Sequence, residues 1–237
     1  MSRIVDPILE ELRHQVLHMG NAAEEILAKS LRALLEKDAA LAAEVQSDDL
    51  EIDRLDVEID DAVLRALALQ SPVADDLRQV VAVKMVASDL ERVGDLARNI
   101  AKSAVRLSTA RPERLPTRFE ELARNSRSAL RDALDAYASL DVVKARAVID
   151  FDDQIDEDEE YVVSEAIGAM GAAPERNAVL VEIILMAKNL ERVADHATNI
   201  AEDVVLAARG ENLKHAEKLG VAPSGGPAAG LQKSGMS

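Results

Sequence analysis

Hydrophobic residues recur at spacings of three and four along nearly the whole chain, which is the period of an α-helix with one buried face. In the most regular stretch these positions are Val83, Val86, Leu90, Val93, Ala97, Ile100, Ala104 and Leu107. A second stretch has Ile183, Met186, Leu190, Val193, Ala197, Ile200, Val204 and Ala207. Patterns sustained over this length predict long helices that pack at shallow angles, as in bundles and coiled coils.

Capping residues, prolines and glycines divide this pattern into six predicted helices. Asp6 followed by Pro7 is typical of a first helical turn, Asp38 and Asp141 are placed to cap later helices, and Ser71-Pro72 is expected to open the third. The segment 110–117 contains two prolines and is interpreted as a linker. We expect helices over residues 6–37, 38–70, 71–108, 118–139, 141–170 and 174–209.

One segment of the chain occurs twice. Residues 89–102 and 189–202 are identical at nine of fourteen positions, which include a Glu-x-x-x-Asp and the Asn that follows it. Further positions match at an offset of 103: Asp38, Val45, Asp49, Ile52, Asp53 and Ile59 correspond to Asp141, Val148, Asp152, Ile155, Asp156 and Val162. An internal repeat of this length indicates a duplicated supersecondary unit.

We therefore predict an all-α fold of two pseudo-symmetric three-helix bundles, residues 1–110 and 111–209. The short connections favour antiparallel neighbouring helices. Residues 210–237 are rich in Gly, Pro, Ser and Ala and have no hydrophobic period, so we expect a disordered tail there.

Composition narrows the possible functions. The net charge of -16 argues against binding to nucleic acid or anionic lipid and favours cations and basic protein surfaces as partners. The chain has no Cys, which excludes thiolate metal sites, and almost no aromatic residues, so its core must be aliphatic. No secretory signal is visible, and the apolar stretches are too short for insertion into a membrane. We expect a cytoplasmic protein.

The candidate chemistry lies in pairs of carboxylates four residues apart, which stack on one side of a helix, beside the apolar stripe. The first half has Asp49, Asp53, Glu91 and Asp95, and the second has Asp152, Asp156, Glu191 and Asp195. If the two helices of each half are neighbours, their pairs converge into a four-carboxylate site. Like charges at this spacing repel by about 0.2–0.5 kcal/mol per pair, and a bound divalent cation would reverse that cost.

Ligation by oxygen alone favours Mg, Ca or Mn, although Fe and Zn also accept carboxylates. A solvated acidic face is the simpler explanation for any single pair. The recurrence of both pairs, in the same order, in both halves favours a metal site.

We expect Arg92 and Arg192 to pair with the aspartate three residues further on. Asn99 and Asn199 can each reach either the site or a neighbouring helix, and His196 is interpreted as solvated, with a role as a ligand as the alternative.

The repeated Leu-Glu-Arg-Val-x-Asp-x-Ala-x-Asn-Ile-Ala, with Asp-x-x-Ile-Asp segments before it, resembles the PhoU family of phosphate-signalling regulators over residues 4–209. The resemblance implies two three-helix bundles, often assembled as a homodimer. It also implies that the eight carboxylates named above hold Mg, Mn, Fe or Zn. Asp158 departs from the repeat, because it stands where the first half has Leu55, and we expect helix five to pack differently or to be shifted.

The resemblance further implies a cytoplasmic negative regulator of phosphate uptake and of the phosphate-starvation response. Such a protein links the ATPase subunit of a phosphate ABC transporter to a sensor histidine kinase. We therefore expect a metal-binding regulatory adaptor that is not an enzyme and has no catalytic residues. A di-metal carboxylate enzyme is one alternative, although its ligands would project into the bundle and not beside the apolar stripe. A purely structural helical scaffold is the other.

Overall fold

The structure is a computed structural model that describes residues 6–109, 114–171 and 174–214. These residues form six α-helices, a short 3₁₀ helix at Pro174–Arg176, and no strand longer than an isolated bridge. The α-helices are α1 (Asp6–Glu36), α2 (Ala39–Gln70), α3 (Asp75–Ser108), α4 (Phe119–Ser139), α5 (Val142–Met170) and α6 (Asn177–Arg209). The all-α prediction is confirmed.

Two of the predicted helix starts are confirmed by their caps. The carboxylates of Asp38 and Asp141 accept hydrogen bonds from the backbone N–H groups two and three residues further on, which have no partner inside the helix. The predicted start of the third helix at Ser71-Pro72 is wrong, because α3 begins at Asp75. Ser71 instead ends α2 in the left-handed conformation, with φ of 44°, so the chain turns away before a new helix forms.

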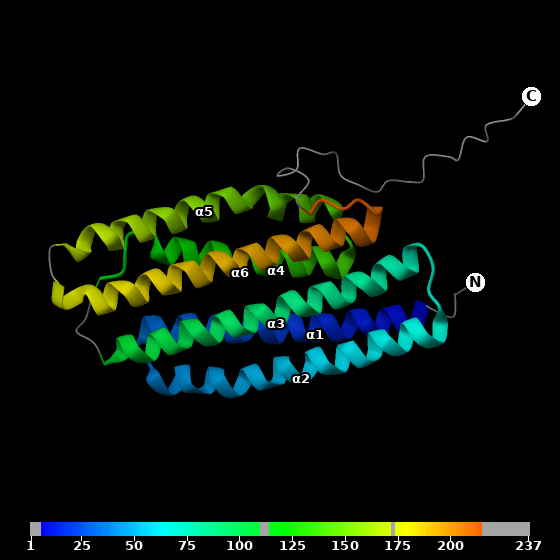
Figure 1. Cartoon of the computed structure of the whole chain (residues 1–237), viewed down its shortest axis with the longest axis horizontal. Coiled ribbons are helices and arrows are strands. Elements are labelled where there is room, and N and C mark those ends of the chain that lie inside the picture. Colours follow the sequence, from blue (N-terminus) through cyan, green and yellow to red (C-terminus); the bar gives the residue numbers. More distant parts are fainter. Residues whose placement is uncertain (1–5, 110–113, 172–173, 215–237) are drawn as a thin grey trace, which may run out of the picture.

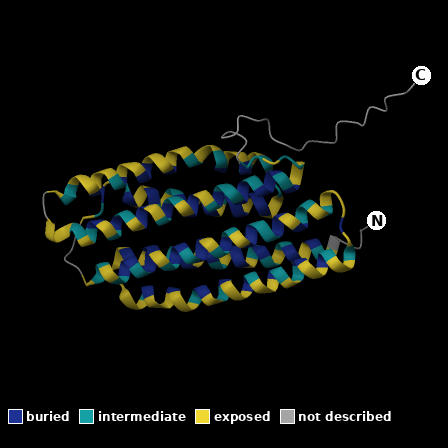
Figure 2. Cartoon of the chain, viewed as in Figure 1, coloured by how far each residue is buried: buried dark blue, intermediate teal, exposed yellow. Residues whose placement is uncertain are grey.

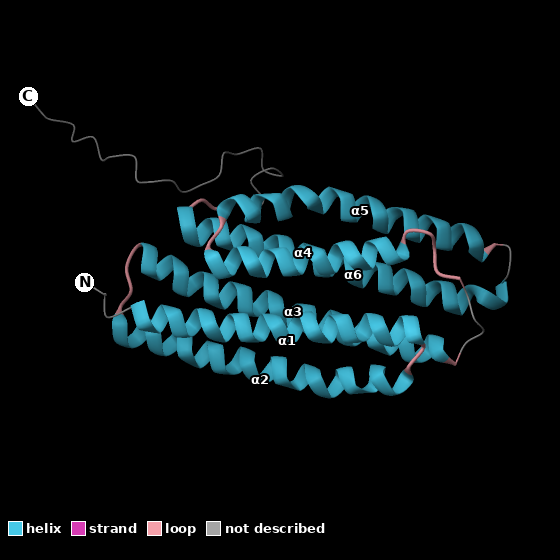
Figure 3. Ribbon diagram, turned by 180° about the vertical axis from the view of Figure 1, so that it is seen from behind, coloured by secondary structure: helices cyan, strands magenta, loops and turns pink. Residues whose placement is uncertain are grey.

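The helices are arranged as two sets of three that meet along α3 and α6 (Figure 1). Each of α1 and α2 packs on α3, and each of α4 and α5 packs on α6. Helices α2 and α5 form the two outer edges, whereas α1 and α4 lie on the face seen from behind (Figure 3). This arrangement leaves α2 beside α3 and α5 beside α6, which are the two pairs of helices that carry the candidate carboxylates.

The core follows the predicted hydrophobic stripes (Figure 2). Every position of the two stripes is buried except Leu107, which is partly buried. Helices α3 and α6 also bury small residues such as Ala87 and Ala187, because each of these helices contacts its two bundle neighbours and the other central helix. Burial of a large aliphatic side chain contributes about 1.5–3 kcal/mol, so these two helices hold the halves together.

Two features of the second half, Asp158 and the beginning of the predicted tail, form specific side-chain contacts. Asp158 is buried on α5, where Asn125 Nδ2 on α4 donates to it over 2.9 Å. Arg118, which immediately precedes α4, places its Nη1 3.3 Å away, so these two partners compensate for the loss of an apolar side chain. Of the predicted tail, the structure describes the first residues, and Arg146 Nη2 donates to Glu211 over 2.8 Å. Residues 215–237 of the tail, and 110–113 of the linker, lie outside the described residues.

Candidate metal centres

The first carboxylate cluster lies between α2 and α3 and is organised by an arginine. Asp49 on α2 is only 1% exposed, which corrects the prediction that it lies on a flank beside the core. Arg98 on α3 donates to both Asp49 and Asp95 and so places a positive charge between two carboxylates. Burial raises the pKa of Asp49, while the Arg98 guanidinium opposes that rise.

A glycine makes room for this buried aspartate. A methyl group on Gly94 would lie 2.8 Å from Asp49 Oδ1, which is too close without a shift, and 3.1 Å from Ile52 Cδ1, which is a tight contact. The corresponding residue in the second half is Ala194, and Asp152, the counterpart of Asp49, is only partly buried. The absence of a side chain at Gly94 therefore permits the closer approach of the acidic side chain in the first half.

The remaining carboxylates of the first half influence one another electrostatically across the two helices. Burial raises the pKa of Glu91 on α3, and the charges of Asp95, Asp56 and Asp53 add to that rise while Arg92 opposes it. Asp53 and Asp56 are on α2, so carboxylates of α2 and α3 are close enough to affect one another's ionisation, whereas their convergence into a metal site stays a prediction. Arg92 pairs with Asp95, as predicted, over 3.6 Å.

The second cluster, between α5 and α6, has no arginine in the equivalent place. Thr198 stands where the first half has Arg98, and its hydroxyl donates to Asp152 over 3.1 Å. Burial raises the pKa of Asp152 to about 6, with further contributions from Asp156 and Asp195. These carboxylates therefore repel one another without a bonded counter-charge.

Glu191 on α6 also has a raised pKa. Burial, followed by the charges of Asp195, Asp156 and Glu159, raises its pKa to about 7. Lys188 opposes the rise, but its ammonium forms an ion pair with Glu159 over 2.9 Å. Among the described residues, neither Glu191 nor Asp195 has a hydrogen bond or ion pair, so the predicted pairing of Arg192 with Asp195 is wrong.

The structure therefore brings the predicted residues together as two clusters of unequal charge. The first cluster consists of Asp49, Asp53, Glu91 and Asp95 with Arg98, and the second consists of Asp152, Asp156, Glu191 and Asp195 with Thr198. Across residues 6–109, 114–171 and 174–214, no group of three or more His, Asp or Glu side chains is already arranged to hold a metal ion. A cation would have to draw these side chains toward one another.

Sequence reasoning missed the contacts that cross between the halves. His196 Nδ1 lies 2.7 Å from Asp89 Oδ1 on α3, so the interpretation of this histidine as a solvated side chain is wrong. Asn199 Nδ2 donates to the same oxygen over 3.3 Å, which resolves its two predicted roles in favour of a neighbouring helix. The only signal in the sequence was that Asp89 and His196 both differ from their repeat counterparts, Asn189 and Leu96.

A further buried acid, Asp203, lies near this contact on α6. It is 0% exposed, and Lys214 Nζ lies 3.0 Å from its Oδ1. Burial raises its pKa to about 7, and the charges of Asp89 and Glu202 add to the rise while Lys214 opposes it. The carboxylate at position 203 is thus costly to ionise in the folded protein.

Asp203→Asn is expected to raise the free energy of unfolding at pH 8 by on the order of 2–4 kcal/mol and to change it little at pH 4. The pKa of Asp203 is higher in the folded protein than its ordinary value of 3.8. Stability is therefore lost as the pH rises from about 4 to 7, and asparagine removes that loss. Urea denaturation at both pH values measures the effect, with the exposed Asp61→Asn as the control. An equal effect at both pH values would contradict this prediction.

Comparison with known proteins follows the same division into two halves. The family model of the PhoU domain matches residues 16–104 and 119–204, one match in each three-helix set. The chain belongs to the PhoU family. A PhoU homolog from Caulobacter vibrioides is 38% identical over 208 residues, covering 86% of this chain and 90% of the relative. PhoU from Escherichia coli K12 is 30% identical over 207 residues, covering 87% and 86%.

Solved PhoU structures share the whole fold. The crystal structure of PhoU from Pseudomonas aeruginosa matches with a TM-score of 0.84 at 31% identity, over 86% of this chain and 99% of that one. The phosphate transport system regulatory protein PhoU from Streptococcus pneumoniae matches with a TM-score of 0.82 at 30% identity, over 89% and 99%. The relatives from Caulobacter and E. coli are named as phosphate-specific transport system accessory proteins. Of the helices described here, none is both long and apolar enough to cross a bilayer.

Proposed function

We propose that this protein is an accessory regulator of a phosphate transport system, acting as a metal-binding adaptor without catalysis. Membership of the PhoU family is the observation that supports this role. Relatives matched over most of their length are named phosphate-specific transport system accessory proteins, and the PhoU structure from Streptococcus pneumoniae is titled a phosphate transport system regulatory protein. The partners would be the ATPase subunit of a phosphate ABC transporter and a sensor histidine kinase. The protein would act in the cytoplasm as a homodimer and repress the starvation response when phosphate is ample.

The metal part of this proposal is supported by the chemistry of the second cluster. Asp152, Asp156, Glu191 and Asp195 offer only oxygen donors, and a cation would offset both the burial and the repulsion that raise the pKa values of Asp152 and Glu191. Such donors fit Mg or Mn, and also Fe or Zn. The bound ion would supply a fixed positive charge that holds α5 and α6 together.

The first cluster fits a metal less well, because Arg98 already supplies a positive charge to Asp49 and Asp95. Asp49, Asp53, Glu91 and Asp95 would bind a cation only if it displaced that guanidinium. We therefore propose that the second half binds metal more tightly than the first.

Deletion of the gene tests the regulatory role. Alkaline phosphatase expression is expected to become constitutive in phosphate-rich medium, and a wild-type copy is expected to restore repression. Repression that survives the deletion would overturn the proposed function. Complementation with Asp152→Ala/Asp195→Ala tests the metal part of the proposal separately. If this variant restores repression, the regulatory role does not require the second cluster.

The alternative of a di-metal enzyme gains no support from the site. That chemistry uses Glu-x-x-His motifs that project into the bundle. The chain has one such spacing, from Glu11 to His14, and both side chains are exposed on α1.

A further inference from the structure

A groove of about 530 Å³ runs between α1 and α4, on the face of the molecule shown in Figure 3. A second hollow of about 420 Å³ continues it toward the end of the bundle and shares Leu34, Leu35 and Glu120 with it. We call the two hollows together the α1–α4 groove. The carboxylate clusters lie on the other helix pairs, and none of their eight predicted ligands lines this groove.

The charge of the groove is opposite to that of the chain. Six basic residues line it, against three acidic ones, whereas the whole chain has a net charge of -16. The bases are Arg32, Lys37, Arg114, Arg124, Arg127 and Arg131, and the acids are Glu24, Glu36 and Glu120. A local reversal of this size on an acidic protein selects for an anionic ligand.

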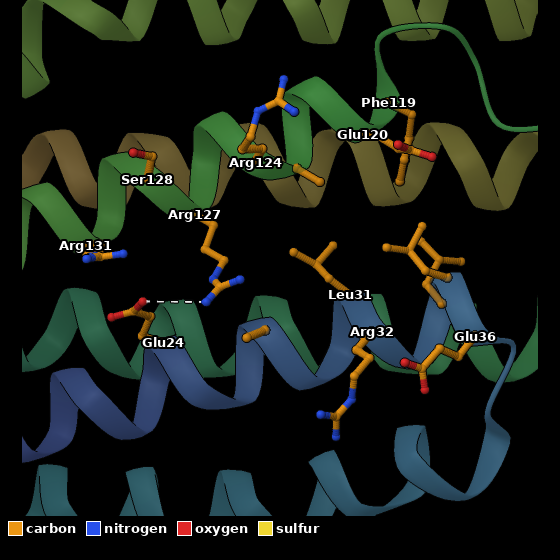
Figure 4. Close-up of a pocket in the computed structure, with 14 residues that line it drawn as sticks. Glu24, Leu31, Arg32, Glu36, Phe119, Glu120, Arg124, Arg127, Ser128 and Arg131 are labelled. Atoms are coloured by element: carbon orange, nitrogen blue, oxygen red, sulfur yellow. Dashed lines mark ion pairs between the residues drawn. The ribbon is translucent and has the colours of Figure 1, made fainter.

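Most of this positive charge is available to a ligand. Among the described residues, Arg32 and Arg131 form no ion pair. Arg127 reaches from α4 toward Glu24 on α1, as Figure 4 shows, but the distance between their charged atoms is 3.9 Å. Arg124 has an equally long contact with Glu121. Exposed contacts of this kind contribute at most about 1 kcal/mol, so an acidic ligand can replace them.

The floor of the groove is apolar. Leu31 lies between the two helices in Figure 4, and Ala28 and Ala123 line the same space. Leu35, where the two hollows meet, is 56% exposed, which leaves most of an aliphatic side chain in water. A ligand that matches this groove must therefore carry apolar groups as well as negative charge.

The spacing of the arginines identifies the shape of that ligand. Arg124, Arg127 and Arg131 follow one side of α4 and span about 10 Å along its axis at 1.5 Å per residue. Figure 4 shows the side chain of Arg127 turned toward α1 and that of Arg124 turned away from it, so these guanidinium groups do not converge on a single phosphate. The spacing along α4 matches carboxylates placed three and four residues apart on another helix. We infer that the α1–α4 groove binds an acidic amphipathic helix of a partner protein, with apolar side chains on the floor and carboxylates along the arginines.

Charge disfavours the occupants that this chain itself could supply. A two-fold contact between copies would place one groove on the other and bring two sets of six bases together. Contact between the groove of one copy and the acidic surface of α5 in a second copy would be heterologous, because it joins two different surfaces. Such contacts build an open filament of copies unless the rotation between them closes a ring. Residues 215–237 contain Lys218 and Lys233 but only one acid, Glu217, so they do not complement the groove.

The inference rests on the proposed adaptor function, since the groove supplies a partner contact, but its test requires no metal. The probe is a fluorescein-labelled peptide of about 18 residues, or about 27 Å as a helix, with Leu and Ala on one face and Glu on the other. Fluorescence anisotropy in EDTA is expected to show binding with a Kd below about 100 µM. Arg124→Glu/Arg131→Glu is expected to weaken binding by about tenfold or more, and Leu35→Asp by a similar factor.

The matched control is Arg65→Glu/Arg209→Glu, which makes the same change in net charge at two exposed arginines outside the groove. This variant is expected to change the Kd by less than about twofold. A peptide of the same composition with its apolar and acidic residues scrambled is expected to bind at least about tenfold more weakly.

Several results would overturn the inference: no binding to the wild type at about 100 µM, equal loss in the control variant, or equal binding of the scrambled peptide. Sedimentation that shows a change in oligomeric state for Arg124→Glu/Arg131→Glu alone would assign the groove to a second copy instead. Because the peptide is tested without metal and outside the cell, failure of the deletion experiment leaves this result unaffected.

Discussion

Arg98→Thr is expected to lower the free energy of unfolding of the metal-free protein at pH 8 by about 3–5 kcal/mol. Asp49 is 1% exposed, and its partner in the structure is the Arg98 guanidinium, so the substitution leaves a buried charge unpaired. The substitution also gives the first cluster the composition of the second, where Thr198 occupies the corresponding position. We therefore expect one additional Mn²⁺ ion per chain, measured by mass spectrometry of the metal after dialysis.

In Arg98→Thr, added Mn²⁺ is expected to restore about 2.7 kcal/mol of the lost free energy of unfolding when its concentration is one hundred times its Kd. Arg92→Thr is the matched control, because Arg92 is on the same helix but is exposed and lies 3.6 Å from Asp95. It is expected to cost less than about 1 kcal/mol and to add no metal. A loss in Arg98→Thr no larger than in this control, or unchanged metal content, would contradict the role assigned to Arg98.

Asp152→Asn/Glu191→Gln is expected to abolish the stabilisation of the protein by metal. At one hundred times its Kd, a metal ion stabilises the wild type by about 2.7 kcal/mol, or about 5–10 °C in Tm for a chain of this length. The variant is expected to show no such shift, because two of its four ligands are neutral. Calorimetry with Mn²⁺ and with EDTA measures the difference.

The same variant is expected to be more stable than the wild type in EDTA at pH 8. The pKa values of Asp152 and Glu191 are raised from 3.8 and 4.5 to about 6 and 7, so their ionisation lowers stability as the pH rises from about 4 to 7. The gain is expected to disappear at pH 4. Asp150→Asn/Glu157→Gln, at two exposed acids of α5, is the control and should retain the metal-dependent shift. A metal-dependent Tm in the Asp152→Asn/Glu191→Gln variant would place the site elsewhere.

The local features of the fold were predictable because each is determined by residues close together in the chain. The stripe from Val83 to Ala104 recurs every three or four residues, and such a period buries one side of a helix in any bundle. Asp38 and Asp141 cap their helices through N–H groups two and three residues away. The predicted start of α3 was wrong because Ser71 adopts a left-handed conformation, so the helix does not begin at Pro72.

The chemistry of the two clusters was predictable only in part. The repeat placed the eight carboxylates on two pairs of neighbouring helices, and the charges of Asp53 on Glu91, and of Asp156 on Glu191, contribute to the raised pKa values of the two glutamates. Their role as metal ligands stays a prediction. The sequence also contained the difference between Arg98 and Thr198. The effect of that difference on the two clusters depends on the distance from position 98 to Asp49 on α2, which no local sequence pattern gives.

The sequence by itself determined six amphipathic helices, the caps of α2 and α5, the duplication and the family, since all of these depend on near neighbours or on repeated residues. Tertiary structure alone decided that Asp49 is buried beneath Arg98, that His196 meets Asp89 across the two halves, and that α1 and α4 leave an arginine-lined groove. Each of these depends on how closely two helices approach. That distance is determined by the packing of the whole core, through contacts such as the one that Gly94 permits.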